Sequence, residues 1–344
     1  MQKVKAEIHL ASIRRNAEKF SALTGTKVCA VVKANAYGHG AETVVGALVN
    51  TVDAFAVALV EEAISIRACA CGKDILVLTP PTTEEEAYYI AVNGFTATLS
   101  GMDTVQLLRD TCRKFRVFAK AHIKLNTGMN RYGTDVDEFI RVCQYLTDDP
   151  FVKVTGCYSH LYTTDTSVSE KQRSLFLTAE RVCKRYFPFA TAHLSATYGA
   201  TLGRAFAFDM VRIGIGLYGY CPTENALGLE KAMTVKAKVV QQRTYAFGGA
   251  GYGLATVEKG EKLGVLRFGY ADGFLRKREN GVDGWQEQAN CLCMDACLRK
   301  NGAKIGEWTP ILTDAEKVAK ETGTIAYEVL CASTRRAEFS YDED

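Results

Sequence analysis

Apolar residues follow two alternating patterns along the first two thirds of the chain. Short runs rich in Val, Ile, Leu and Ala are typical of strands that are buried on both faces of a parallel sheet. These runs predict eight strands: Val28–Lys33, Ala54–Val60, Ile75–Thr79, Thr96–Leu99, Val117–Leu125, Val152–Ser159, Ala190–Leu194 and Met210–Leu217. The segments between them have helical apolar spacing, and they include Ala41–Val49, Glu61–Ala68, Asp103–Phe115, Val136–Leu146 and Ser169–Tyr186.

Eight strands that alternate with helices predict an α/β fold, a closed (β/α)8 barrel. A doubly wound open sheet is the alternative. The dinucleotide-binding fingerprint G-x-G-x-x-G does not follow the first predicted strand, and this disfavours the open sheet.

The pattern changes after Pro222. Short β-rich segments are separated by glycine-containing turns, and only Thr313–Thr322 has helical spacing. We therefore expect two domains, a barrel over residues 1–222 and a mostly β domain over residues 223–344. The strands predicted for the second domain are Val235–Thr244, Gly264–Phe268, Gln288–Cys293 and Tyr327–Ala332.

Composition narrows the classes of function. The formal charge is only +3, from 42 basic and 39 acidic residues, so nothing indicates a nucleic-acid or membrane-surface partner. No apolar run approaches the roughly 18 residues of a spanning helix, and the start lacks the apolar segment of a secretion signal. We expect a soluble cytoplasmic protein that acts on a small molecule.

The 12 cysteines fit a reducing compartment as small buried apolar residues. Two clusters, Cys69-x-Cys71 and Cys291-x-Cys293-x3-Cys297, raise the question of structural zinc. Such a site needs paired CxxC motifs or nearby histidines, and no histidine lies near either cluster in sequence. We expect core cysteines and no metal.

Functional groups of a barrel enzyme collect where strands end and the following loops begin. Several chemically versatile side chains fall at such positions in the predicted strands. They are Lys33 at the end of the first strand, Lys124 and Arg131 around the end of the fifth, His160 after the sixth, Thr197 after the seventh, and Arg212 within the eighth, followed by Gly214 and Ile215.

Each of these residues also has an ordinary structural interpretation. Lys33 adjoins a buried run and, taken alone, would more often be a snorkelling or ion-paired lysine than a Schiff-base amine. Arg212 would more often form a buried ion pair, for which Asp209 is the candidate partner. His160 would more often be a hydrogen-bonded core residue, and Tyr252 and Tyr270 would more often be turn aromatics.

The motifs that carry these residues resemble the alanine racemase family. In the barrel they are Ala30–Gly40 (AVVKANAYGHG), Lys124–Gly133 (KLNTGMNRYG) and Val211–Gly219 (VRIGIGLYG). In the second domain they are Gly251–Gly253, Gly269–Gly273, Cys293–Asp295 and Gly323–Glu328. The matches keep the family order over nearly the whole chain. His193–Gly199 is locally more similar to the serine/alanine racemase domains of vancomycin-resistance loci.

The resemblance implies a pyridoxal 5'-phosphate-dependent racemase that interconverts L- and D-alanine and works as a head-to-tail homodimer. Racemisation needs a proton removed on one face of Cα and delivered on the other. The family roles assign one base to Lys33, which also holds the cofactor, and the second to Tyr252 of the partner subunit. A tyrosine with an ordinary pKa of about 10 is a poor base, so we expect nearby positive charge to lower the pKa.

The resemblance also assigns the binding residues. Arg212 would contact the pyridine nitrogen and His160 would face the ring, while Arg131 would meet the phenolic oxygen and the substrate carboxylate. Lys124 matches a position that is often carbamylated. The remaining roles are the phosphate site, formed by Tyr37, Thr197, Gly214, Ile215 and Tyr327, and the substrate site of the second domain, formed by Met294 and Tyr270.

Some positions depart from the family pattern. Thr197 stands where serine is usual, Asn126 replaces a common aspartate, and Asn290-Cys291 replaces a Gly-Arg pair. These departures keep other functions open. The alternatives are a serine or broad-specificity racemase, a non-catalytic barrel that binds pyridoxal phosphate, and a fold-related decarboxylase.

Overall fold

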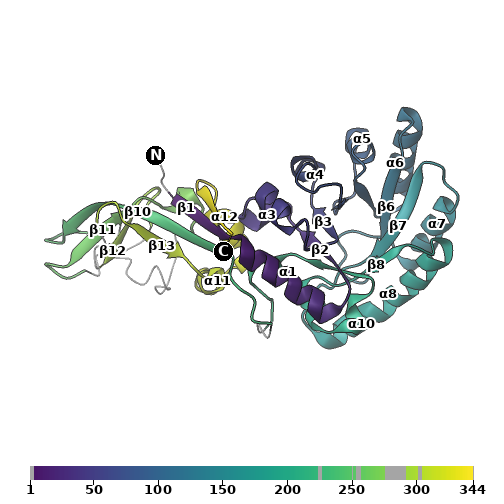
Figure 1. The fold of residues 1–344 in the computed structure, drawn as a ribbon. Helices are drawn as coiled ribbons and strands as arrows, with labels where there is room; N and C mark the ends of the chain where they lie inside the picture. The colour runs from purple at the N-terminus through teal and green to yellow at the C-terminus, as the bar shows by residue number, and fades with distance from the viewer. Residues whose placement is uncertain are drawn as a thin grey trace.

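We describe a computed structural model of the chain over residues 4–223, 227–249, 251–252, 257–275, 292–300 and 304–343. The first large unit is an eight-stranded parallel sheet in the order β8-β7-β6-β5-β4-β3-β2-β9, with helices outside it (Figure 1). Its strands are β2 (Lys27–Val31), β3 (Ala54–Val57), β4 (Asp74–Val77), β5 (Thr96–Leu99), β6 (Ala119–Lys124), β7 (Val152–Tyr158), β8 (Thr191–His193) and β9 (Met210–Ile213).

The two ends of this sheet meet, so the strands form the expected barrel. Strand β9 pairs in parallel with β2, in a register that places Arg212 opposite Cys29. On its other side, β9 follows β8 through two backbone bonds, from Asp209 N to Ala192 O at 3.0 Å and from Arg212 N to Ser195 O at 2.9 Å. The barrel interior and its contacts with the helices form one continuous apolar core.

The longer helices cover the outside of the barrel, and their apolar sides face the strands (Figure 1). Polar residues start several of them: Thr83 Oγ1 accepts from Glu86 N, and Asp135 Oδ1 accepts from Glu138 N. The helices of this region are α1 (Leu10–Thr24), α2 (Lys33–Gly38), α3 (Ala41–Leu48), α4 (Val60–Ile66), α5 (Glu84–Val92), α6 (Met102–Phe115), α7 (Val136–Leu146), α8 (Thr166–Tyr186), α9 (Thr197–Thr201), α10 (Arg204–Ala207) and the 3-10 helix η1 (Ile215–Tyr218).

The second sheet extends to one side of the barrel (Figure 1). Its path runs β12-β11-β10-β1-β14, and β13 also pairs with β10. Its elements are β1 (Val4–His9), β10 (Met233–Thr244), β11 (Lys262–Leu266), β12 (Cys297–Lys300), β13 (Trp308–Leu312) and β14 (Glu338–Asp342), with η2 (Tyr270–Asp272), α11 (Ala315–Thr322) and α12 (Ala326–Ser333).

The chain contributes to this second sheet from both of its ends. Strand β1 lies between β10, which is antiparallel to it, and β14, which is parallel to it. Helix α1 then leads directly from β1 to the barrel. We propose to keep the division into residues 1–222 and 223–344, with β1 crossing from the first segment into the second sheet.

The structure corrects several predictions about local conformation. Tyr327–Ala332 lies in helix α12, so the predicted strand is wrong: Ala326, Val329, Leu330 and Ser333 are buried at helical spacing. Ile215–Leu217 lies in the 3-10 helix η1 because β9 ends at Ile213. The predicted strand Gln288–Cys293 falls outside the described residues up to position 291, and its last two residues are described as part of no strand.

The structure also addresses the expected absence of membrane and metal features. Among the helices of the described ranges, none combines the length and the apolar character that crossing a bilayer requires. No group of three or more His, Cys, Asp or Glu side chains in those ranges is arranged to hold a metal ion. Of the cysteine clusters, Cys71 is exposed and Cys69 is partly exposed, whereas Cys291 lies outside the described residues.

The placement of β1 generates a stability prediction. Ile8 is fully buried between β10 and β14, so Ile8→Ala should lower the free energy of unfolding by about 3 kcal/mol. Ile305 has 63% of its surface exposed, and Ile305→Ala should change the free energy of unfolding by less than about 0.5 kcal/mol. Urea unfolding of both variants tests this. Equal effects of the two substitutions would show that β1 contributes no core.

Candidate active site

Lys33 follows strand β2 and begins an unusual turn. Ala34, Asn35, Ala36 and Tyr37 all have left-handed backbone angles, with φ between 52° and 54°. Each such residue costs about 1–2 kcal/mol relative to the right-handed conformation, because its Cβ crowds the following carbonyl. The turn is held in part by a bond of 2.7 Å from Ala34 N to Glu62 Oε1. It places Lys33 and Tyr37 at the mouth of the barrel, where the strands end.

Burial changes the proton equilibrium of the two lysines at this mouth. Burial lowers the pKa of Lys33, and the positive charge of Arg131 lowers it further. Lys124, at the end of β6, is only 5% exposed, and burial together with Arg212 and Arg131 lowers its pKa to about 7. Both amines are therefore easier to deprotonate than an ordinary lysine. A neutral amine is the form that attacks a carbonyl carbon.

The Arg212 side chain is buried in the barrel, with 3% of its surface exposed. Its Nη2 donates to Ser159 O at 2.7 Å and to Leu194 O at 3.0 Å, and its Nη1 donates to His193 O at 3.0 Å. Three carbonyl oxygens thus compensate the desolvated charge without a carboxylate. The predicted alternative, an ion pair with Asp209, does not occur, because Asp209 pairs with Lys184 at 2.9 Å.

A chain of two histidines continues from Arg212 into the barrel. Arg212 Nη1 lies 2.8 Å from His193 Nδ1, and His193 Nε2 lies 2.9 Å from His122 Nδ1. A guanidinium can only donate, so His193 Nδ1 accepts and its Nε2–H donates to His122. Burial lowers the pKa of His122 to about 4 and keeps that of His193 well below its usual range. Both rings are therefore neutral at pH 7.

The Tyr158 ring lies at the barrel mouth, in contact with His193, Lys124 and Arg212. It stacks on His193 with ring centroids 4.9 Å apart and planes within 4° of parallel. Lys124 Nζ lies 4.4 Å from its centroid, and Arg212 Cζ lies 5.1 Å from it. An electron-rich face attracts cations, which helps to hold two like charges close together. Within the described ranges, no carboxylate forms an ion pair with Lys33, Lys124, Arg131 or Arg212.

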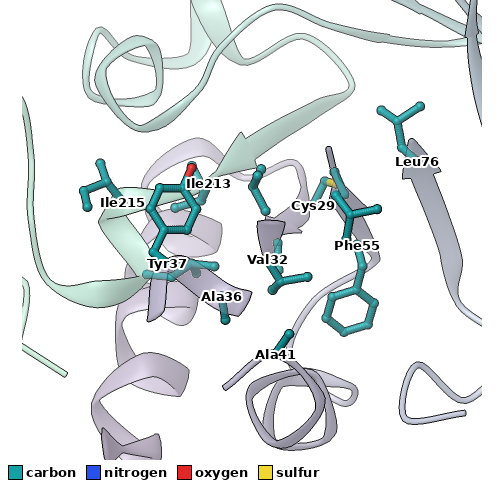
Figure 2. Packing of buried hydrophobic residues seen from close by; sticks show 14 of the residues in the cluster. Cys29, Val32, Ala36, Tyr37, Ala41, Phe55, Leu76, Ile213 and Ile215 are labelled. Carbon is teal, nitrogen blue, oxygen red and sulfur yellow. The ribbon is translucent and has the colours of Figure 1, made fainter. Parts of the chain in front are cut away.

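Helices α2 and α9 meet the turn after β9 beside this cluster. Their residues Tyr37, Thr197 and Gly214 are called the cradle from here on. A Cβ at Gly214 would come within 2.5 Å of Tyr37 Oη, so a larger residue there would require the Tyr37 ring to move. Figure 2 shows the Tyr37 hydroxyl pointing toward the segment that carries Ile213 and Ile215. Thr197 Oγ1 accepts from Gly216 N at 3.1 Å, on the other side of the same turn.

Tyr37 and Arg212 each contact one further predicted residue. The Tyr37 and Tyr327 rings have centroids 6.0 Å apart, so Tyr327 of helix α12 reaches the barrel mouth. His160 follows β7, and its Nδ1 accepts from Arg212 Nη2 at 3.2 Å. Burial, and then the charge of Arg212, keeps the pKa of His160 well below its usual range.

A buried glutamine connects the loops that carry Arg131 and His160. Gln172 of helix α8 donates to Thr127 Oγ1 at 2.9 Å and to His160 O at 3.1 Å. Thr127 in turn lies 2.8 Å from Ser159 Oγ. The loop after β6 is thereby fixed to the loop after β7. Arg131 itself is exposed and lies over the Tyr132 ring.

The predicted residues of the second domain lie apart from this cluster. Tyr252, Met294 and Tyr270 are 63%, 57% and 39% exposed. Backbone bonds bring two of their segments together, from Tyr270 N to Cys293 O and from Ala271 N to Met294 O. In the part of the chain that the structure describes, no hydrogen bond or ring contact links these three side chains to the barrel mouth.

The structure therefore brings together the barrel residues that the strand-end rule and the motifs singled out. It adds His193, His122, Tyr158 and Gln172, to which the sequence alone assigns no role. His193 ends β8, so the same strand-end rule could have found it. Tyr158 is the last residue of β7, so the rule applies to it as well. His122 and Gln172 lie inside a strand and a helix with ordinary patterns, and no spacing in the sequence marks them.

The buried histidines generate a prediction about acid stability. Burial lowers the pKa of His39 and His122 to about 4, and those of His160 and His193 further. Below pH 6.5 the unfolded chain binds protons that the folded chain refuses, so stability present above that pH is lost as pH falls. Each histidine should lower the free energy of unfolding by about 2 kcal/mol as the pH falls from 7 to 5. Urea unfolding between pH 7 and pH 5, which lies above the carboxylate pKa values, tests this prediction. A free energy of unfolding that does not change with pH over this range would contradict it.

Comparisons with known proteins agree with this architecture. A sequence model described as alanine racemase, N-terminal domain, matches residues 8–222, and one described as alanine racemase, C-terminal domain, matches residues 232–341. The chain is 31% identical over 363 residues to the alanine racemase of Synechocystis sp., covering 97% of this chain and 98% of the relative.

Solved structures give the same result. The alanine racemase of Clostridium difficile 630 superposes with a TM-score of 0.91 at 28% identity, covering 100% of this chain and 97% of that chain. The alanine racemase of Bartonella henselae, solved with covalently bound pyridoxal phosphate, superposes with a TM-score of 0.84 at 26% identity, covering 99% of this chain and 100% of that chain. Because the two sequence models together span the barrel and the second domain, this chain belongs to the alanine racemase family.

Proposed function

We propose that this chain is a pyridoxal 5'-phosphate-dependent isomerase that interconverts L- and D-alanine. The observation that carries the proposal is the position of Lys33. Its amine, whose pKa is lowered, lies at the barrel mouth among Lys124, Arg131 and Arg212. An aldehyde cofactor with a phosphate group needs such an amine together with positive charge. The names of related structures, which mention pyridoxal phosphate and L-Ala-P, support the same class of ligand.

The residues present fit this cofactor. Gly214 leaves the space in which a Cβ would meet Tyr37 Oη at 2.5 Å, and the Thr197 hydroxyl lies on the same turn. Together with Ile215 and Tyr327, these groups would hold the phosphate. The surplus of positive charge at the mouth suits an anionic ligand, since the described residues supply no carboxylate that pairs with it.

When bound, pyridoxal 5'-phosphate supplies the electron sink that lets the substrate Cα lose its proton. Lys33 would bind the aldehyde and act as the base on one face of Cα. Arg212 would hold the pyridine nitrogen and keep its own proton, because three carbonyl oxygens and two neutral histidines accept from it. His160 would face the ring, and Arg131 would bind the substrate carboxylate.

Two further roles concern Lys124 and Tyr252. Lys124 has a pKa of about 7, so a large fraction of its amine is neutral near pH 7 and can attack carbon dioxide. An N–C bond would then form, a proton would leave, and the resulting carbamate anion would orient Arg131. The exposed Tyr252 would supply the second base, together with Met294 and Tyr270, to the site of a partner subunit in a homodimer.

The first test is the reaction itself. The purified chain loaded with pyridoxal phosphate should exchange L- and D-alanine, and Lys33→Ala should lower kcat by at least about 10³-fold because it removes both the attachment point and a base. Chiral chromatography after incubation with each enantiomer measures this, with L-serine as the competing substrate and carbon dioxide release as the sign of a decarboxylase. Faster exchange of serine than of alanine would replace the proposed substrate.

The second test asks whether two subunits share one site. Lys33→Ala and Tyr252→Phe should each be nearly inactive, because each removes one base. Mixing and reassociating them should restore about a quarter of wild-type turnover, since half of the dimers are mixed and each mixed dimer has one intact site. Each variant incubated alone through the same dissociation step is the control. If the mixture stays as inactive as its components, both bases come from one chain.

The third test concerns Arg212. Replacing it with glutamate puts a group that can exchange a proton where the guanidinium keeps its proton. Arg212→Glu should therefore raise the share of L-alanine that is converted to pyruvate by transamination, relative to racemisation. Lactate dehydrogenase-coupled detection of pyruvate measures it. Arg212→Lys, which keeps a donor with positive charge, should form less pyruvate than the glutamate variant; equal pyruvate from both would count against this role.

A further inference from the structure

The left-handed turn after β2 needs a partner that holds it, and one buried ring lies in position to do so. We propose that His39 is a positioning residue: its imidazole fixes the turn Ala34–Tyr37 and thereby sets where Lys33 and Tyr37 point. The consequence for the cofactor rests on the proposed function, whereas the effect on the turn does not.

The contacts of His39 are with the turn itself. Its Nδ1 lies 3.0 Å from Ala36 O and 3.1 Å from Tyr37 O. Both partners are carbonyl oxygens, so Nδ1–H donates to them. Its backbone N–H also donates to Ala36 O, at 3.0 Å. The ring therefore adds a second donor to Ala36 O and supplies one to Tyr37 O, and in this way it closes the turn as a cap would.

The second ring nitrogen, Nε2, shows which group of His39 holds the turn. Nε2 is buried and has no hydrogen-bond partner. The residue is fully buried, and burial lowers its pKa to about 4, so the ring is neutral at pH 7 with one donor and one idle acceptor. A buried acceptor left without a partner is unfavourable. The donor function of Nδ1 therefore accounts for a polar ring at this position.

The ring also connects the turn to the cradle. His39 stacks on Tyr218 with centroids 4.3 Å apart, and Tyr218 lies 5.0 Å from the Tyr37 ring. Tyr218 donates to Val31 O at 3.3 Å, at the end of β2. On the far side, Gly38 contacts helix α12 so closely that a Cβ would come within 2.5 Å of Leu330 O. The turn thus packs between η1 and α12, and His39 supplies the hydrogen bonds within it.

Two substitutions separate the donor from the ring. His39→Phe keeps a flat ring against Tyr218 and removes the donor. His39→Asn removes the ring and keeps a donor, because Asn Nδ2 is bonded to Cγ as His Nδ1 is. His9→Phe, in strand β1 of the second sheet, is the control for loss of a histidine elsewhere. If His39→Phe does not fold, His39→Leu, which matches asparagine in size, replaces it.

The first readout is hydrogen exchange of the cofactor-free protein, followed by mass spectrometry on the peptide that spans residues 33–40. His39→Phe should exchange this peptide at least about tenfold faster than wild type, whereas His39→Asn and His9→Phe should stay within about threefold of it. Wild-type protection in His39→Phe, or equal loss in the asparagine variant, would overturn the proposal.

The second readout is the dissociation constant of pyridoxal phosphate, measured by absorbance and by borohydride trapping on Lys33. His39→Phe should raise it about tenfold or more and His39→Asn by less than about threefold. If wild type itself does not bind the cofactor, the proposed function fails, and the exchange experiment still decides the role of His39. If wild type binds and His39→Phe binds equally well, the positioning role fails alone.

Discussion

Pairing of strand β9 with strand β2 is the constraint on which the mouth of the barrel depends. It joins the first and last strands of the barrel, with Arg212 opposite Cys29 and Ile213 opposite Ala30. The chain then leaves both strands at the same edge, because parallel strands end together. Lys33 and the Gly214 turn become neighbours for this reason, although they lie at opposite ends of the barrel sequence. A register shift of one residue would turn Arg212 out of the barrel.

A second constraint is the concentration of like charge at this edge. Burial is the largest cause of the lowered pKa of Lys33, Lys124 and His160. The charge of Arg131 lowers all three further, and the charge of Arg212 lowers those of Lys124 and His160. The barrel tolerates Arg212 because carbonyl oxygens, neutral histidines and the Tyr158 face surround it. Such a site is unfavourable by itself and favours any anion that enters it. The same feature that strains the free protein therefore provides binding energy for a phosphate and a carboxylate.

The barrel strands and most of their helices could be predicted from sequence because their apolar periods are strong and their burial is simple. The left-handed turn could not, since Ala34–Tyr37 contains no glycine, and a single asparagine, Asn35, does not predict four consecutive residues at positive φ. Helix α12 departs from the predicted strand because Tyr327 and Val329 favour strands locally, while packing at a spacing of three to four residues decides the outcome. The pairing of β1 with β10 and β14 is long-range, and no local pattern encodes such a partner.

The geometry of a barrel mouth explains why the second domain matters for the proposed reaction. Residues at strand ends would contact a bound ligand from the barrel side, so groups on its other side would have to come from another part of the protein. Racemisation needs a proton group on each face of Cα. Lys33 and its neighbours belong to the barrel, whereas Tyr252 and Met294 stay exposed in the described part of a single chain. A partner subunit that laid those side chains over the mouth would complete the site, and it would also bury apolar surface that one chain leaves in water.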